Sequence, residues 1–151
     1  MKKVLVILGS RSDEAICKPA LDLLTEFGVE YNYHISSAHR NPVQTAELAQ
    51  GAVAAGIGVI IAAAGMAAHL PGVIAAHTPL PVIGLPIASG SLNGVDSLYS
   101  IVQMPPGVPV ACVGINNAKN AALLAIQILA TASPELAARF AQYKADLASP
   151  R

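Results

Sequence analysis

Ile57-Gly58-Val59-Ile60-Ile61-Ala62-Ala63 is the stretch that decides the fold. It contains no charged or polar side chain. A strand with one face in water alternates apolar and polar residues, whereas an unbroken apolar run is typical of a strand that is buried on both faces of a parallel sheet. The stretch therefore predicts a parallel sheet that is covered by helices on both sides.

The same pairing of a strand with a helix recurs along the rest of the chain. Further strands are expected over residues 3–8, 29–35, 81–85 and 108–115. Helices are expected from a cap at Ser10 or Ser12 to about residue 27, and over about 42–55, 71–77, 94–103, 117–130 and 134–147. This pattern predicts one α/β domain over residues 1–151, a three-layer αβα sandwich with an extra C-terminal helix. A flavodoxin-like five-stranded sheet in the order 2-1-3-4-5 fits this length best.

The predicted strand order also indicates where a ligand would bind. Open parallel sheets bind ligands at the carboxyl ends of their strands, beside the point where the strand order reverses. In the order 2-1-3-4-5 this point lies between the first and third strands. The loop after the second strand starts on the other side of the first strand, so we expect it to lean over that strand or to be joined by neighbouring subunits.

The composition predicts an oligomer. Hydrophobic residues make up 54% of the 151 residues and charged residues only 12%, against about 45–50% and about 25% in typical soluble proteins. A surface so poor in charge favours burial against other subunits, so we expect a homo-oligomer. The formal net charge is zero. The chain therefore lacks the basic footprint of a nucleic-acid-binding protein, and we expect no nucleic-acid partner.

The N-terminal apolar run, residues 4–8, is too short for a signal peptide and ends at a loop-like stretch. No uninterrupted apolar run approaches the ~20 residues of a membrane span. We therefore expect a cytoplasmic protein with no membrane partner. Cys17 and Cys112 lack metal-ligand spacing, so each is expected to be a small buried hydrophobic residue.

Ser36-Ser37-Ala38-His39-Arg40-Asn41-Pro42 combines several reactive groups in a few residues. It follows an expected strand and precedes a helix that Asn41 can cap and Pro42 can begin. Imidazoles ordinarily titrate near neutral pH, which suits proton transfer, and a guanidinium can hold a carboxylate or phosphate through two hydrogen bonds. His39 and Arg40 are therefore candidate functional residues, although a backbone-bound loop histidine and a solvated arginine would give the same sequence.

Gly9-Ser10-Arg11-Ser12-Asp13 follows the first strand and opens a helix. Amides and hydroxyls at a helix start bind phosphate well, whereas Asp13 would suit a ribose hydroxyl better. The stretch has neither the Gly-x-Gly-x-x-Gly of dinucleotide sites nor the Gly-Lys-Ser/Thr of phosphate loops. On spacing alone, an ordinary capped helix start is the simpler interpretation.

The other histidines are scattered singly along the chain. His69 lies in a turn of small residues, where contact with a substrate and hydrogen bonding to loop carbonyls fit equally well, whereas His34 and His77 are expected to be structural. Such scattered histidines predict no metal site. The small residues at 88–94 and 114–117 can line a pocket or an interface. The residues alone thus predict a pocket for a phosphorylated small molecule, with one acid/base histidine and no evident nucleophile, and they leave the reaction open.

Four motifs, in order along the chain, resemble the PurE family of purine biosynthesis. They are GSRSD at 9–13, SAHRNP at 37–42, GMAAHLPG at 65–72 and GVDSLYSIVQMP at 94–105, and the likeness continues through 116–122. Together they cover nearly the whole chain. The Ala-His-Leu-Pro-Gly sequence at 68–72 resembles the bacterial mutase class of the family.

The resemblance implies a mutase, an isomerase of de novo purine biosynthesis that leads to IMP and uses no cofactor and no metal. The carboxyl group of N5-carboxyaminoimidazole ribonucleotide moves from the exocyclic nitrogen to ring carbon 4, which gives 4-carboxy-5-aminoimidazole ribonucleotide. In the family mechanism, carbon dioxide is released into a closed pocket and recaptured. His39 matches the family's proton-transfer residue and would act as the general acid and base.

The resemblance also implies the residues that bind this phosphoribosyl substrate. Ser10, Asp13 and Arg40 match substrate-binding positions. Within the pocket we assign Ser10, Ser12, Ser37 and Arg40 to the phosphate and Asp13 to the ribose hydroxyls.

Gly65, His69 and Leu70 match the loop that closes over the base and the carboxylate. The family assembles as a homo-octamer with sites shared between subunits. Many relatives carry a longer C-terminal tail that embraces neighbouring subunits, whereas this sequence ends at Arg151.

The chain departs from the family pattern in the loop that usually reads Gly-Ala-Gly-Gly-Ala-Ala-His. Ala63 and Met66 replace two of its glycines. If the second of these positions needs a positive φ, Met66 must be strained or the loop reshaped. Asn41 replaces the usual threonine, and little change is expected because both residues can cap a helix.

Two other functions stay open at this point. One is direct carboxylation of aminoimidazole ribonucleotide by carbon dioxide, against which the Ala-His-Leu-Pro-Gly sequence argues. The other is a catalytically silent paralogue that binds a nucleotide. Met66 favours the silent paralogue, whereas intact His39 and Arg40 argue against it.

Overall fold

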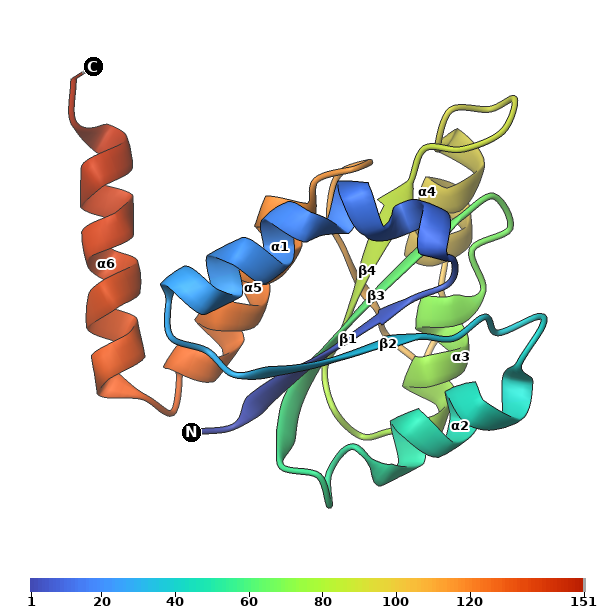
Figure 1. Cartoon of the computed structure of the whole chain (residues 1–151), viewed down its shortest axis with the longest axis horizontal. Coiled ribbons are helices and arrows are strands. Elements are labelled where there is room, and N and C mark those ends of the chain that lie inside the picture. The colour runs from blue at the N-terminus through green and yellow to red at the C-terminus, as the bar shows by residue number, and fades with distance from the viewer. Residues whose placement is uncertain (151) are drawn as a thin grey trace.

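A computed structural model describes residues 1–150, and Arg151, the last residue of the expected domain, lies outside the described residues. Five parallel strands form one sheet in the order β2-β1-β3-β4-β5 (Figure 1). The strands are β1 (Lys3–Leu8), β2 (Tyr31–Ile35), β3 (Ile57–Gly65), β4 (Val82–Ile87) and β5 (Ala111–Cys112). The predicted flavodoxin-like strand order is therefore confirmed.

Helices cover both faces of the sheet, which gives the expected three layers (Figure 1). The face that carries Val4, Val6 and Leu8 packs against α1, α5 and the start of α6. The opposite face packs against α2, α3 and α4. The helical elements are the short 3-10 helix η1 (Arg11–Asp13), α1 (Glu14–Glu26), α2 (Pro42–Gly51), α3 (Leu70–His77), α4 (Val95–Val102), α5 (Ala118–Ala130) and α6 (Pro134–Ala148).

Strand β3 is buried on both faces, as its unbroken apolar sequence predicts. Val59 to Ala63 are each at most 1% exposed. Val59 and Ile61 contribute to the core beneath α1 and α5, whereas Ile60 contributes to the core beneath α2 and α3. Full burial of one such aliphatic side chain stabilises a fold by about 1.5–3 kcal/mol. Both layers therefore hold β3 and fix the position of the loop that follows it.

Strand β5 is much shorter than the predicted strand over 108–115. Pro109 precedes it and has no amide to donate to a neighbouring strand. Beyond β5, the Val113 amide donates to the Gly84 carbonyl of β4 at 3.2 Å. The segment thus runs beside β4 at the edge of the sheet with few ladder hydrogen bonds, and an apolar composition alone did not reveal this.

The predicted cap of α2 is also corrected. Asn41 occupies the N-cap position, but its side chain accepts no amide hydrogen bond from the helix. Its φ of −138° and ψ of 63° depart from the extended conformation of a capping residue. Its Nδ2 instead donates to Gln44 Oε1 at 2.8 Å. The helix ends at Gly51, several residues before the expected end near residue 55.

Serine side chains cap two of the helical segments, and the cap at Ser10 is one of the two that the sequence predicted. The Ser10 hydroxyl accepts a hydrogen bond from the Ser12 amide at 3.3 Å and caps η1, the first turn that leads into α1. The Ser133 hydroxyl accepts from the Leu136 amide at 3.3 Å and caps α6. A short polar side chain before a run of amides satisfies donors that have no partner within the helix.

Helix α6 stands at one end of the molecule, beyond α1 and α5 (Figure 1). It is attached through an aromatic cluster in which Phe27 contacts Phe140 and Tyr143, with ring centroids 6.3 and 5.6 Å away. Arg139 Nη1 donates to the Phe27 carbonyl at 2.9 Å. The contacts end near Tyr143, so the rest of α6 is exposed.

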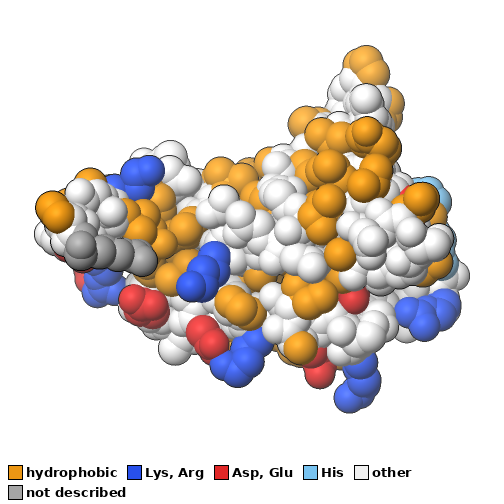
Figure 2. All heavy atoms as spheres, turned by 90° about the horizontal axis from the view of Figure 1, so that it is seen from above, with side chains coloured by type: hydrophobic (Ala, Val, Ile, Leu, Met, Phe, Trp, Pro, Cys, Tyr) orange, Lys and Arg blue, Asp and Glu red, His pale blue; other side chains and the backbone are white. Residues whose placement is uncertain are grey.

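Apolar and charged side chains are unevenly distributed on the surface. Figure 2 shows most of the charged side chains toward the lower edge of the viewed face, with apolar side chains both among them and in a larger group at the upper right. Within residues 1–150, none of the helices combines the length and the apolar character that crossing a membrane requires. Cys17 is buried as expected, whereas Cys112 is only half-buried because it lies in the edge strand.

Candidate active site

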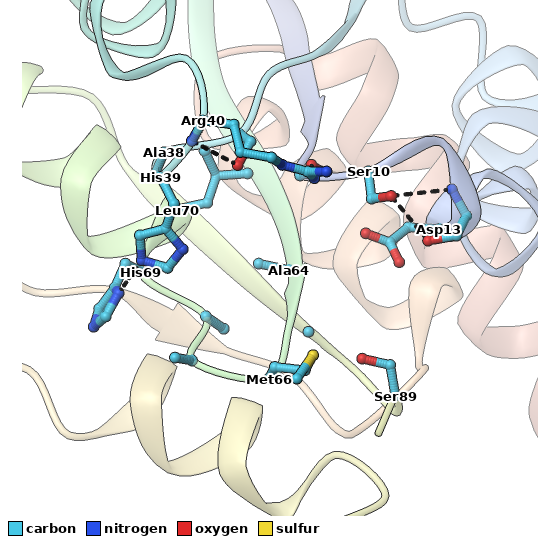
Figure 3. A pocket seen from close by; sticks show the side chains of 16 residues that line it. Ser10, Asp13, Ala38, His39, Arg40, Ala64, Met66, His69, Leu70 and Ser89 are labelled. Carbon is cyan, nitrogen blue, oxygen red and sulfur yellow. Dashed lines mark hydrogen bonds between the residues drawn. The ribbon is translucent and has the colours of Figure 1, made fainter. Parts of the chain in front are cut away.

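A cavity of about 510 Å³ opens at the carboxyl ends of the strands, beside the reversal of strand order. The loops after β1, β2, β3 and β4 all contribute to its wall (Figure 3). The lining comes from within residues 9–13, 37–40 and 64–70, together with Ser89. The cavity therefore lies where the strand order predicts a ligand site.

The start of η1 supplies paired hydroxyls to the cavity. Ser10 Oγ and Ser12 Oγ lie 2.9 Å apart, and Ser10 Oγ also accepts the Ser12 amide. Asp13 ends the same turn and is only 6% exposed. Strand β1 fixes all three residues because its buried end leads directly into the turn.

Burial gives the Asp13 carboxyl an unusual environment. Loss of solvent raises the pKa of Asp13 above its ordinary value, and a hydrogen bond from the Ser10 backbone and the positive charge of Arg40 oppose that rise only in part. A carboxylate that has lost water gains more from new hydrogen-bond donors than an exposed one. The group is therefore suited to accept hydrogen bonds from a ligand.

The loop after β2 leans over β1 within a single chain. Arg40 Nη2 donates to the Gly9 carbonyl at 3.0 Å, which ties the loop to the end of β1. The Arg40 amide donates to Ser37 Oγ at 3.2 Å. The strand order predicted that this loop leans over β1 or is joined by neighbouring subunits. Within the single chain, the loop leans over β1.

A buried hydroxyl pair anchors the same loop to α2. Ser36 Oγ and Thr45 Oγ1 lie 2.8 Å apart, and Thr45 Oγ1 donates to the Asn41 carbonyl at 3.0 Å. Ser36 and Thr45 are at most 2% exposed. Buried polar groups that are fully paired fix local geometry more tightly than exposed ones. The anchor therefore holds the position from which His39 projects.

His39 and His69 meet at one side of the cavity (Figure 3). His39 Nε2 is within hydrogen-bonding distance of His69 Nδ1. The two rings are nearly perpendicular, at 86°, with centroids 4.7 Å apart. Both side chains are exposed to the cavity and solvent. The sequence did not predict this pairing, because the two residues come from different loops 30 positions apart.

The end of β3 forms the floor of the cavity against the loop after β4. A β-carbon on Gly65 would lie 2.5 Å from Ser89 Oγ, so only glycine allows the two loops to approach this closely. Met66 follows with φ of 55°, in the left-handed region that favours glycine. Of the two expectations for this position, a strained Met66 or a reshaped loop, the structure shows the strained residue.

All nine residues predicted to form the site line this one cavity. They are Ser10, Ser12, Asp13, Ser37, His39, Arg40, Gly65, His69 and Leu70. Ser89 also lines it and was anticipated only as part of the small-residue stretch 88–94. The stretch at 114–117 instead borders a separate surface hollow beside α5.

The two histidines assigned to structural positions lie elsewhere. His34 is half-buried within β2, and His77 ends α3, where its Nδ1 lies 3.4 Å from Gln50 Nε2. Among residues 1–150, no three or more histidine, cysteine or acidic side chains converge in a way that could hold a metal ion.

The cavity has a polar side and an apolar side. The hydroxyls of residues 10, 12 and 37, the Asp13 carboxyl and the Arg40 guanidinium lie on the side of β1 and β2. Ala64, Met66 and Ala67 lie on the side of β3, with Ser89 as the one hydroxyl beside them. His39 and His69 lie together at the end of the cavity away from Ser10 and Asp13 (Figure 3). Such a site can bind an anionic, hydroxylated small molecule at one side and perform proton transfer next to an apolar space.

The AIR carboxylase family model matches residues 3–149 of this chain. The chain belongs to the AIR carboxylase family. The resemblance to PurE that the sequence motifs carry is thereby confirmed.

Several members of the AIR carboxylase family are more than half identical to this chain. The N5-carboxyaminoimidazole ribonucleotide mutase of Pyrococcus abyssi is 55% identical over 147 residues, which cover 97% of this chain and 84% of that protein. The protein of the same name from Saccharolobus solfataricus is 53% identical over 147 residues, which cover 97% of this chain and 93% of that protein. The phosphoribosylaminoimidazole carboxylase of Schizosaccharomyces pombe is 56% identical over 133 residues, which cover 88% of this chain and 24% of that longer protein.

A solved structure of the family has the same fold. The crystal structure of Treponema denticola PurE superposes with a TM-score of 0.89 at 30% identity, covering 98% of this chain and 92% of that one. The chain is therefore an enzyme of the AIR carboxylase family with an isomerase role.

Proposed function

We propose that the chain is an N5-carboxyaminoimidazole ribonucleotide mutase that moves the carboxyl group through trapped carbon dioxide, with His39 as the general acid and base. One observation carries the proposal: the His39 ring lines the same cavity as the hydroxyls of Ser10 and Ser12 and the Arg40 guanidinium. There it can reach a heterocycle whose phosphoribosyl group is held on the polar side. The names of the relatives from Pyrococcus abyssi and Saccharolobus solfataricus agree with this substrate.

Substrate binding is assigned from the polar side. The phosphate would bind near Ser10, Ser12, Ser37 and Arg40, where hydroxyls and a guanidinium converge. The ribose hydroxyls would donate to the Asp13 carboxylate. His69, with Gly65 and Leu70, would close over the base and the carboxyl group.

The chemistry then needs one proton carrier. The bond between the carboxyl carbon and the exocyclic nitrogen breaks, its electron pair stays on nitrogen, and His39 donates a proton to that nitrogen as carbon dioxide leaves. Carbon 4 then attacks carbon dioxide and forms the new carbon–carbon bond. His39 removes the proton from carbon 4 and returns to its starting state. The sequence of steps uses no cofactor and no metal, and neither cysteine lines the cavity to act as a nucleophile.

A second candidate function is direct carboxylation of aminoimidazole ribonucleotide by carbon dioxide. It is favoured by the 56% identity to the carboxylase of Schizosaccharomyces pombe. Both reactions form the same carbon–carbon bond at carbon 4, and they differ in whether the carboxyl carbon arrives on the substrate or from solution. The Ala-His-Leu-Pro-Gly sequence at 68–72 favours the mutase.

Turnover with two substrates tests the proposal. The purified chain is given the carboxyamino ribonucleotide in one reaction and aminoimidazole ribonucleotide with bicarbonate in the other, and His39→Asn serves as the blank. Efficient use of the first substrate without high bicarbonate supports the mutase. Preference for the second supports the carboxylase, and binding without turnover of either supports a silent paralogue.

The chain is also proposed to act in the cytoplasm as a homo-octamer, without nucleic-acid or membrane partners. An assembly is supported by exposed apolar side chains on α4 and the loop before it, namely Leu92, Val95, Tyr99 and Val102. These are between 45% and 61% exposed in the single chain. Light scattering coupled to size-exclusion chromatography measures the assembly directly, and a clean monomer would contradict it.

A further inference from the structure

Met66 is the one long side chain among residues 63–68, where the apolar side of the cavity begins. Its neighbours in this range are all alanine or glycine. Its φ of 55° lies where an L-residue is strained and glycine is not. Strain that persists at a site is a reason to ask what the side chain contributes there. Glycine would fit this backbone conformation better. Any advantage of methionine at this position therefore has to come from its side chain.

The Met66 side chain lies along the backbone of the opposite loop. A β-carbon placed on Gly90 would be 3.7 Å from both Cγ and Cε of Met66 and 3.9 Å from its Sδ. Gly90 has none, so the thioether rests on the loop between β4 and α4. Figure 3 shows Met66 on the side of the cavity opposite Arg40, next to Ser89. The side chain therefore lies at the exposed opening of the cavity and contacts the loop after β4 from the loop after β3.

The backbone around Met66 is held from both directions. Strand β3 ends at Gly65 and α3 begins at Leu70. Between them the Ala68 amide donates to the Met66 carbonyl at 2.9 Å, and the His69 amide donates to the Ala67 carbonyl at 2.8 Å. These tight turns fix where the side chain leaves the backbone. Met66 is 57% exposed and its side chain is unbranched, so it can change rotamer while the loop stays in place.

We propose that Met66 is a specificity-determining residue that retains carbon dioxide between its release from nitrogen and its capture by carbon 4, an inference that rests on the proposed mutase function. Carbon dioxide has no charge and no net dipole, so the polar side of the cavity holds it only weakly. An apolar side chain across its path out of the cavity would delay its escape. Met66 adds the one long apolar side chain among residues 63–68 on this side of the cavity, and so decides how often the released molecule becomes product.

The Met66→Gly substitution separates this role from a structural one. Glycine relieves the strained φ, so the variant should unfold at the same or a higher urea concentration. It also removes the thioether from the opening. If Met66 only filled space in the fold, turnover would stay the same or improve. If Met66 retains carbon dioxide, the variant should lose the gas more often although its backbone is better accommodated.

The experiment follows the carboxyl carbon. The substrate carries a ¹³C carboxyl group, the solution contains excess unlabelled bicarbonate and dissolved carbon dioxide, and mass spectrometry measures the unlabelled fraction of the product. Released aminoimidazole ribonucleotide is quantified beside it, and a reaction without enzyme corrects for spontaneous loss of the carboxyl group. Met66→Gly should raise the unlabelled fraction and the released ribonucleotide several-fold. Met66→Leu, which keeps an apolar side chain of similar volume, should restore low values.

Each result of this experiment supports or contradicts the proposed role of Met66. Equal unlabelled fractions in Met66→Gly and the unaltered chain, with both turning over, would overturn the role of Met66 and leave the mutase function standing. No product from the unaltered chain would overturn the mutase function and this inference together. If Met66→Gly does not fold, Met66→Ala removes the thioether as well and provides the same comparison.

Discussion

The two loops that face each other across the cavity are built differently. The loop after β2 carries polar groups and is fastened by hydrogen bonds to Gly9, to Ser37 and, through Ser36, to α2. The end of β3 and the loop after it, residues 63–68, carry only alanine and glycine apart from Met66, and close packing of Gly65 against Ser89 holds them.

This difference separates two tasks. Proton transfer and charge recognition need fixed polar atoms, and the first loop supplies them. In the proposed mechanism, a small apolar intermediate needs a wall with few polar groups, and the alanine, glycine and Met66 side chains of residues 63–68 would supply it. The two histidines, one from each loop, contact each other at one end of the cavity.

The largest expected effect is a loss of turnover caused by a substitution in the loop after β2. His39→Asn keeps nearly the same size but removes the proton carrier, so turnover should fall by about 10²–10⁴-fold. Binding of the substrate should be largely retained, because the groups assigned to phosphate and ribose are unchanged. Steady-state turnover and equilibrium binding measure the two effects separately. His34→Asn, in β2 and away from the cavity, is the matched control, and substantial residual activity in His39→Asn would rule out its role.

Arg40→Ala tests charge recognition on the same loop. A charged hydrogen bond contributes about 1.5–3 kcal/mol, so the substrate should bind about 10- to 150-fold more weakly. Calorimetric or fluorescence titration measures the dissociation constant. Arg11→Ala removes an arginine of η1 that does not line the cavity and should leave binding unchanged. Equal dissociation constants for Arg40→Ala and the unaltered chain would contradict a direct contact.

Gly65→Ala tests the close packing that holds the second loop. The new β-carbon would lie 2.5 Å from Ser89 Oγ and 3.3 Å from the Ile87 carbonyl. Such overpacking costs about 1–3 kcal/mol of unfolding free energy. Adding Ser89→Ala removes the nearest atom, so the double variant should recover part of that loss in urea unfolding. Strictly additive effects would show that Gly65 and Ser89 do not constrain each other.

The smallest expected effect is a pH-dependent change in stability that comes from the buried carboxyl of Asp13. Because burial raises the pKa of Asp13 above its ordinary 3.8, the folded chain holds this proton more tightly than the unfolded chain. Stability from this group is therefore present below pH 3.8 and is lost as the pH rises through the raised pKa. Asp13→Asn should be more stable than the unaltered chain at neutral pH, and the difference should shrink as the solution is acidified.

Urea unfolding of both chains at neutral and acidic pH provides the comparison for Asp13. A difference that does not change with pH would show that desolvation of the carboxylate is not the cause. Greater stability with weaker substrate binding in Asp13→Asn would indicate a carboxylate that is kept for function at some cost in stability.

Much of the fold could be predicted because the strands carry strong local signals. The apolar runs of β1 and β3 and the hydroxyl cap of Ser10 are determined by neighbouring residues. The length of β5 could not be predicted, since it depends on how far an edge segment follows β4. The side chain of Asn41 was also mispredicted, because Gln44 competes for it.

The sequence predicted which residues line the cavity, but it did not predict how their side chains are arranged. Parallel topology brings the loops after β1, β2 and β3 to one end of the sheet, which is enough to place Ser10, His39 and His69 in one cavity. The approach of the two imidazoles depends on how far the β2 loop leans, and Arg40 sets this through the Gly9 carbonyl. No periodicity or spacing in the sequence indicates that hydrogen bond.

The position of β2 at the edge of the sheet has a further consequence. Strand β2 pairs only with β1 among the described strands, and its residues are all half-buried, whereas β3 is held between two strands and two helical layers. Amide protons of edge strands exchange with solvent through local openings that need less free energy than global unfolding. We therefore expect β2 and the loop after it, which carries His39, to open locally before β3 and the loop that follows β3. Warming this protein should therefore disable proton transfer before it disrupts the enclosure.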